Sequence, residues 1–150
     1  MEWFDEPAET LAAALESICR QAETISNEVK DEMRRRRKTL PNAEKGYLTI
    51  QFKRRAKGFS ASWRITRTYS GNAKGKGVFS RDIRRGRDWY SPLRKFDMAE
   101  KWEQDIAIRA EQKFALLRFD AAKIASLLGA FERAQTARYG LVQALRGLPD

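Results

Sequence analysis

Apolar residues near the start of the chain recur at the spacing of a helix. Over residues 7–38 they step alternately by four and three, an average of 3.5 residues and the period of a coiled-coil seam. The seam consists of Leu11, Leu15, Ile18, Ala22, Ile25 and Val29. The pattern predicts one helix that ends before Pro41 and needs a partner helix, in this chain or in a second copy. We expect a homodimer.

The apolar pattern changes its period after this helix. Residues 47–53 and 59–69 alternate between apolar and polar positions, as half-buried strands do. Residues 54–58 are predicted to join the two strands as a basic hairpin turn. A glycine-rich loop is expected over 70–77 and a third strand over 78–84. One face of the hairpin is predicted to be polar, with Thr49, Gln51, Lys53, Ser60, Ser62, Arg64, Thr66 and Thr68.

Helical spacing returns in the last third of the chain, from residue 92 or 97 onward. Residues 97–100 fit a capping box. The apolar series then predicts either one helix of more than thirty residues or two helices separated near Asp120. Thirty helical residues are about 45 Å long, so an overhanging apolar stripe would need another surface to cover it. Gly140, Gly147 and Pro149 predict a short, weak tail at the end.

These elements predict an α+β fold of order α-β-β-β-α in a single domain, residues 1–150. We assign an acidic N-terminal helix to residues 1–40, a basic antiparallel sheet to 45–90 and a C-terminal helical segment to 92–146. A three-stranded antiparallel meander is flanked by the two long helices, which cover one of its faces. The other face stays open to solvent.

The composition excludes several classes of chemistry. The chain has no histidine and a single cysteine, Cys19, so it has no imidazole base, no internal disulfide and no zinc site built on several cysteines. Glu111 and Lys113 form an E-x-K triplet downstream of Asp82, an arrangement that some metal nucleases place on neighbouring strands. Here the triplet falls in a helical pattern that separates its side chains. We expect a protein that is not an enzyme and uses no metal or cofactor.

No uncharged stretch is long enough for a membrane helix, and the acidic first residues are unlike a targeting peptide. We therefore expect a cytoplasmic protein without membrane contact.

The charge of the chain is concentrated in its middle. The formal net charge is +10. Residues 1–33 carry nine acids and two bases, residues 34–95 carry twenty bases and three acids, and residues 96–150 carry eight of each. A block with a net charge of +17 is typical of a nucleic-acid-binding surface, although an ordinary solvated basic surface is the alternative.

Candidate nucleic-acid-binding residues lie on the polar face, at the hairpin turn, in the loop and in two arginine clusters. They are Arg34, Arg35, Arg36, Arg37, Lys38, Gln51, Lys53, Arg54, Arg55, Lys57, Ser60, Ser62, Arg64, Thr66, Lys74, Lys76, Arg81, Arg84, Arg85 and Arg87. Small hydroxyl side chains let a DNA backbone approach, and arginine and glutamine also read base edges. A two-stranded ribbon fits the major groove, so we favour double-stranded DNA. We expect Trp89 and Tyr90 to lie in the core. In the alternative, an RNA- or single-strand-binding module, they would stack on bases.

Several short stretches carry a family resemblance. They are Gly46-Tyr47-Leu48-Thr49-Ile50, Phe59-Ser60-Ala61-Ser62-Trp63-Arg64-Ile65, Tyr90-Ser91-Pro92-Leu93 and a long helix with Trp102, Glu103, Glu111, Phe114 and Arg118. In this order, over residues 45–120, the chain resembles the MobI-type auxiliary proteins of conjugative plasmids and integrative elements. The resemblance implies a DNA-binding relaxosome accessory factor that acts at the origin of transfer and assists a separate relaxase. A basic protein–protein interaction module is a further alternative.

Overall fold

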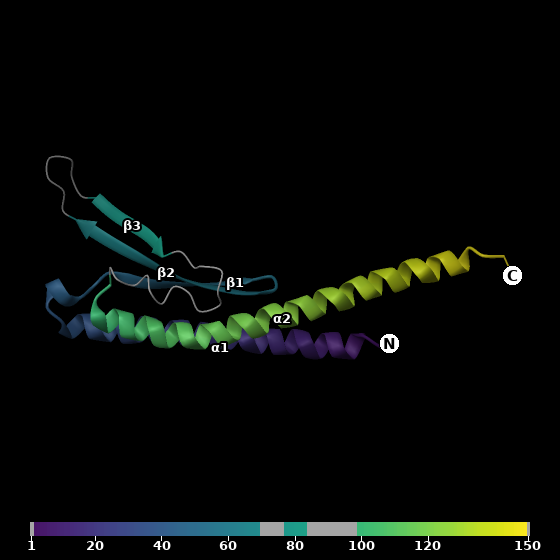
Figure 1. Cartoon of the computed structure of the whole chain (residues 1–150), viewed down its shortest axis with the longest axis horizontal. Coiled ribbons are helices and arrows are strands. Elements are labelled where there is room, and N and C mark those ends of the chain that lie inside the picture. Colours follow the sequence, from purple (N-terminus) through teal and green to yellow (C-terminus); the bar gives the residue numbers. More distant parts are fainter. Residues whose placement is uncertain (1, 70–76, 84–98, 150) are drawn as a thin grey trace.

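The computed structural model describes residues 2–69, 77–83 and 99–149. It contains a long helix, three strands and a second long helix (Figure 1), which confirms the predicted α+β arrangement. Helix α1 spans Asp5–Thr39, strands β1, β2 and β3 span Leu48–Arg55, Gly58–Tyr69 and Gly77–Ile83, and helix α2 spans Lys101–Arg146. A short 3-10 helix, η1, covers Asn42–Glu44 between α1 and β1.

The strands form one antiparallel sheet in the order β1-β2-β3. Pairing of β1 with β2 extends to Arg55 opposite Gly58, so the turn between them has two residues, Ala56 and Lys57. The predicted five-residue turn over 54–58 was wrong. Charged side chains at a strand end leave the backbone groups free to continue the ladder, and hydropathy alone does not reveal this.

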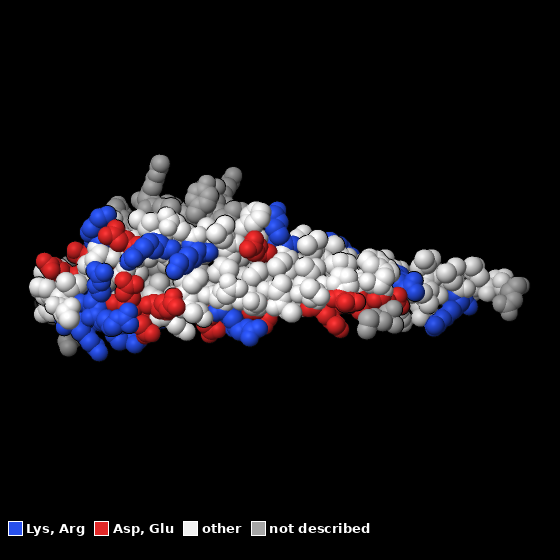
Figure 2. All heavy atoms as spheres, turned by 90° about the horizontal axis from the view of Figure 1, so that it is seen from below, with Lys and Arg blue, Asp and Glu red and all other residues white. Residues whose placement is uncertain are grey.

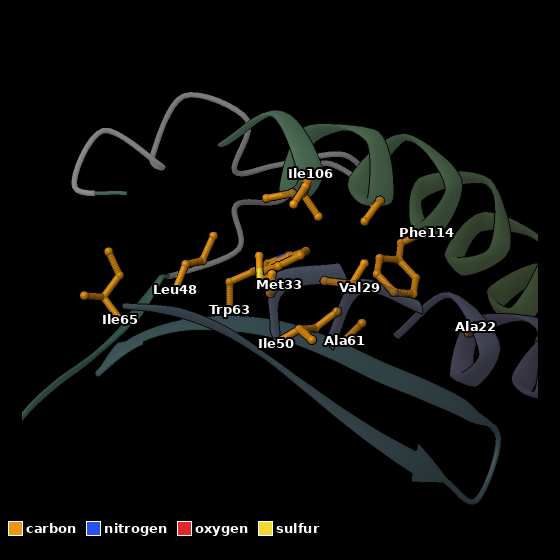
Figure 3. Packing of buried hydrophobic residues seen from close by; sticks show 12 residues of the cluster. Ala22, Val29, Met33, Leu48, Ile50, Ala61, Trp63, Ile65, Ile106 and Phe114 are labelled. Atoms are coloured by element: carbon orange, nitrogen blue, oxygen red, sulfur yellow. The ribbon is translucent and has the colours of Figure 1, made fainter. Parts of the chain in front are cut away.

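One face of the sheet packs against both helices and forms the main core (Figure 3). Strands β1 and β2 contribute alternate residues to it, as predicted: Leu48, Ile50, Ala61, Trp63 and Ile65. The helices contribute Ala22, Val29, Met33, Ile106, Ala107, Ala110 and Phe114. The side chain of Trp63 is 2% exposed, and Phe114 is fully buried.

The apolar seam of α1 is covered within the chain. Leu15 and Ile18 pack with Ala121 of α2, and Ala22 and Val29 belong to the main core. The partner helix that the 3.5-residue period requires is therefore α2, in the same chain. The homodimer stays a prediction, and the α1 seam does not supply its interface.

Helix α2 is a single helix of 46 residues. It begins at Lys101, and the carboxylate of Glu103 accepts a hydrogen bond from the backbone N–H of Glu100 at 3.0 Å. This cap lies three residues after the predicted one, and Ala99 and Glu100 precede the helix. The helix continues through Asp120 and Gly140 and ends at Arg146, so the tail begins at Gly147 and its predicted start at Gly140 was wrong: one glycine inside a helix costs only about 1 kcal/mol.

A buried polar cluster fastens α2 to β2. Glu111 is fully buried and accepts hydrogen bonds from Trp63 Nε1 at 2.7 Å and from both terminal nitrogens of Arg118 at 2.7 and 2.9 Å. Arg118 Nη2 also donates to the carbonyl of Ala61 at 2.9 Å. Each ion therefore has a partner of opposite charge, as burial of charge requires. The cluster fixes the position of β2, and hence of its outer face, along α2.

Within the described residues, no helix combines the length and the apolar character needed to cross a membrane.

Candidate nucleic-acid interface

The side of the sheet that faces away from both helices carries polar side chains from all three strands. We call this surface the open face, and it consists of Thr49, Gln51, Lys53, Arg55, Ser60, Ser62, Arg64, Thr66, Ser80 and Asp82. The strand register places Gln51 opposite Ser62 and Lys53 opposite Ser60. Gln51, Lys53 and Ser62 are exposed, which confirms the predicted polar and solvent-facing side of the hairpin.

An ion pair lies at the centre of the open face. Arg64 Nε donates to the carboxylate of Asp82 at 2.6 Å, across the pairing of β2 with β3. The hydrogen bond from Arg64 lowers the pKa of the Asp82 carboxyl, and the bond to Asp82 raises the pKa of the Arg64 guanidinium. Arg64, which we predicted to contact DNA, therefore already has an acidic partner on the same surface.

The arginine run at the end of α1 divides between structural and exposed residues. Arg37 is half-buried and donates to the carbonyls of Lys45 at 2.9 Å and Leu48 at 2.6 Å, as well as to Glu103. Its guanidinium also lies 5.5 Å from the centre of the Trp102 ring. The structure thus gives Arg37 the role of joining α1 to β1 and α2, which the sequence did not indicate.

The other members of the run are exposed. Arg34 pairs with Asp31 at 3.2 Å, a contact one helical turn back along α1. Arg36 lies 3.9 Å from Glu32 in the same way. Arg35 and Lys38 complete the exposed set. Pairs of this kind on a helix surface are weak, so these side chains can exchange their partner for another anion.

A basic hollow lies between the end of α1 and strand β1. It has a volume of about 460 Å³ and is lined by Lys30, Met33, Arg34, Arg37, Lys38, Lys45 and Ile50, so that each charged lining residue is a cation. Figure 2 views the helical side of the molecule and shows Lys and Arg gathered at the end where α1 finishes. Because Ile50 belongs to β1, the hollow borders the strand that carries Thr49 and Gln51 on its open side. We call it the basic hollow.

At the tip of the hairpin, Arg54 is turned towards α1. It is paired with Phe59 on the inner face of the sheet, and it contacts Glu16 at 2.8 Å and Glu23 at 3.0 Å. The hydrogen bond from Arg54 lowers the pKa of the Glu16 carboxyl. Arg54, which we predicted to contact DNA, is therefore paired with two acids of α1.

The remaining cations of the tip divide between the two faces. Lys57 lies 3.4 Å from Glu132 of α2, on the helical side. By strand alternation, Lys53 and Arg55 lie on the side of the open face, and both are exposed. Of the four predicted DNA-contacting cations around the hairpin turn, Lys53, Arg54, Arg55 and Lys57, the structure thus places Lys53 and Arg55 on the open face.

The third predicted cluster is only partly described. Arg81 is paired with Ile65, so it lies on the opposite side of the sheet from the open face, and it is exposed. The predicted residues Lys74, Lys76, Arg84, Arg85 and Arg87 lie outside the described residues, as do Trp89 and Tyr90.

The acidic residues considered for metal-dependent cleavage do not come together. Asp82 lies on the open face, whereas Glu111 is buried on the helical side of the same sheet. In the described part of the chain, no group of three or more Asp, Glu, Cys or His residues could hold a metal ion.

Two cations of the basic hollow, Lys30 and Lys45, were missing from the sequence prediction. Lys30, Arg34 and Lys38 recur every four residues and so form one stripe on α1, a signal that the sequence contained. Lys45 follows η1, and no periodic pattern indicates that the chain returns there beside α1.

A family model described as "MobI protein" matches residues 18–132, which is most of the chain. No curated protein and no solved structure was found to match it.

Proposed function

The chain belongs to the MobI family of mobilisation accessory proteins, and from that premise we propose that it binds double-stranded DNA at the origin of transfer of a conjugative element and assists a separate relaxase there. It acts in the cytoplasm as a non-enzymatic factor that holds the DNA while the relaxase nicks it. A chain without histidine suits this division of work, because a relaxase of the histidine–metal type cannot be built from it.

The observation that carries this proposal is the separation of charge along α1. Four acids and no base occupy residues 5–16, whereas residues 33–38 carry five bases and no acid, and α1 contributes four of the five cations of the basic hollow. Acidic side chains in the lining would repel a polyanion, and the lining contains none. Duplex DNA carries one negative charge per about 1.7 Å of its axis, so a stripe of lysine and arginine on one helix fits it.

We assign different tasks to the two surfaces. Lys30, Arg34 and Lys38 of the basic hollow hold the phosphate backbone, which gives affinity for any sequence. Gln51 and Ser62 of the open face contact base edges in the major groove, which gives preference for the origin. The small side chains around them leave room for the DNA to approach the sheet.

Fluorescence anisotropy on labelled duplexes tests this assignment. The duplexes are the origin of transfer of the element that encodes the chain and a random sequence of equal length. Lys30→Ala/Lys38→Ala should weaken binding to both duplexes and lower the slope of log affinity against log salt by about two, because two phosphate contacts are lost. Gln51→Ala should weaken binding to the origin alone, by about 1–3 kcal/mol.

Arg20→Ala is the matched control for the lysine variant, because Arg20 is an exposed cation of the same helix outside the hollow. It should leave the salt slope at the wild-type value. Salt-independent binding, or equal losses in all three variants, would contradict the assignment. Competition by single-stranded DNA and by RNA separates the duplex-binding function from a module for unpaired strands.

A further inference from the structure

The distal part of α2 extends beyond the rest of the molecule. Figure 1 shows that α2 extends past the end of the molecule at which α1 begins. From Tyr139 to Pro149, each residue except Val142 is exposed. Several of these residues are large and apolar: Tyr139 is 67% exposed, Leu141 59% and Leu145 56%.

Along this extension runs an uninterrupted apolar seam. Its positions step by three and four residues and contain only leucine and alanine: Leu127, Ala130, Ala134, Ala137, Leu141, Ala144 and, just past the helix end, Leu148. Six of the seven are exposed, and Ala134 is half-buried. One heptad earlier the same positions hold Asp120 and Lys123, so the seam is confined to the distal segment. We call it the distal seam.

The distal seam differs from the seam of α1 in having no cover within the described chain. Both have the period of a coiled coil, but α1 lies against α2 and the sheet. An apolar stripe of this length on a soluble helix is stable when another helix packs on it. We propose that the distal seam joins two copies of this chain, with their α2 helices antiparallel.

The sizes of the seam residues fit an antiparallel partner. With the helices reversed and centred between Ala134 and Ala137, Leu127 of one copy lies opposite Ala144 of the other, and Ala130 lies opposite Leu141. Leu127 and Leu141 thus each meet an alanine, which is the arrangement that fills an interface without voids. The segment that pairs with itself, residues 127–144, is about 27 Å long.

Charges next to the seam favour the same direction. Arg133 and Arg138 flank it on opposite sides. In a parallel pair, Arg133 of each copy would face Arg138 of the other, and two like-charge contacts would result. Reversal of one helix separates these arginines.

Charge complementarity also points to a second copy. Residues 133–149 contain three arginines and no acid, whereas residues 5–16 of α1 contain four acids and no base. Within one chain, Arg138 already pairs with Glu2, which precedes α1. An antiparallel pair brings the basic distal segment of each copy back beside the acidic start of α1 in the other copy. In a parallel pair, both distal segments would extend beyond the start of α1 and would not lie near its acids.

Light scattering on the full chain at micromolar concentration tests the association. The wild type should have twice the mass of one chain, and Leu141→Glu should have the mass of one chain with unchanged helical circular dichroism. Leu116→Glu is the matched control, because Leu116 is 70% exposed on the same helix outside the distal seam. It should stay dimeric. A monomeric wild type, or a dimeric Leu141→Glu variant, would overturn the proposal.

Disulfide cross-linking tests the direction. A mixture of Leu127→Cys chains with Ala144→Cys chains should form the mixed disulfide under mild oxidation, located by mass spectrometry of the linked peptides. The native Cys19 is buried, and burial raises the pKa of its thiol, so it should stay unreacted. Leu127→Cys chains linked to each other would indicate a parallel pair and overturn the antiparallel arrangement. Neither result depends on DNA binding.

Discussion

Arg37 of α1 and Glu103 of α2 form an ion pair in which Nη2 lies 2.5 Å from Oε2. The Glu103 side chain is fully buried, and the same oxygen accepts a hydrogen bond from the backbone N–H of Leu48 at 2.7 Å. One carboxylate therefore fastens the end of α1, the start of β1 and the start of α2. The first two of these elements, α1 and β1, line the basic hollow.

Replacement of Glu103 by alanine should strongly destabilise the fold. The half-buried Arg37 would lose its counter-charge and the N–H of Leu48 its acceptor, a loss of about 3–5 kcal/mol. Urea denaturation gives the free energy of unfolding. Asp105→Ala is the control, because Asp105 is an exposed partner of Lys101 at 3.1 Å on the same helix and should change stability by about 1 kcal/mol or less. Equal losses of unfolding free energy in the two variants would mean that the buried pair stabilises the fold no more than the exposed pair does.

Gly46 should not tolerate a side chain. Its φ of +66° favours glycine, and an added Cβ would lie 1.9 Å from Oε1 of Glu103. The left-handed backbone alone costs alanine about 1–2 kcal/mol, and displacement of the buried carboxylate adds to this. Thermal unfolding of Gly46→Ala should occur well below that of the wild type. Gly140 lies at a helical position with open space around it. Gly140→Ala should therefore increase the free energy of unfolding by about 0.5–1 kcal/mol and raise the melting temperature.

The pH dependence of Asp82 should report its bond to Arg64. Because the folded pKa lies below the ordinary value of 3.8, this pair contributes stability above that pH and loses it as the pH falls through the lowered pKa. The carboxyl carbon signal of Asp82, followed by NMR, should therefore titrate below pH 3.8. In Arg64→Ala the midpoint should return towards the ordinary value. An identical midpoint in both proteins would show that the pair does not persist in solution.

Asp82→Asn should bind duplex DNA more tightly than the wild type. The change removes the acid of the open face and frees Arg64 for a phosphate or a base edge, so the affinity should rise several-fold, most at low salt. Asp120→Asn alters the net charge equally at an exposed position of α2 and should have a smaller effect. If Asp120→Asn has the same effect as Asp82→Asn, net charge and not the open face determines the affinity.

The faces of β1 and β2 could be predicted from the sequence because alternation in a strand is a local property. Thr49, Gln51 and Ser62 point to solvent, and Trp63 points to the core, as predicted. The partner of α1 could not be predicted, since Leu15 and Ala121 are more than one hundred residues apart. A periodic seam indicates that a partner exists, and it does not say in which chain that partner lies.

The candidate site shows the same limit for single side chains. The run 34–38 is conspicuous as a group, yet the role of Arg37 depends on Glu103, 66 positions later in the chain. Arg54 is equally conspicuous in the sequence, but in the structure it forms ion pairs with two acids of α1. Charge density in the sequence therefore indicated a candidate region, and the tertiary contacts show which of its cations already have acidic partners.

The length of α2 has a geometric consequence for the DNA. In the antiparallel pair we propose, the two Glu111 positions, each beneath the middle of a sheet, are separated by about 49 helical residues, or about 75 Å. Each sheet would then contact its own stretch of DNA, so one antiparallel pair should bind two separate half-sites and not a single continuous site.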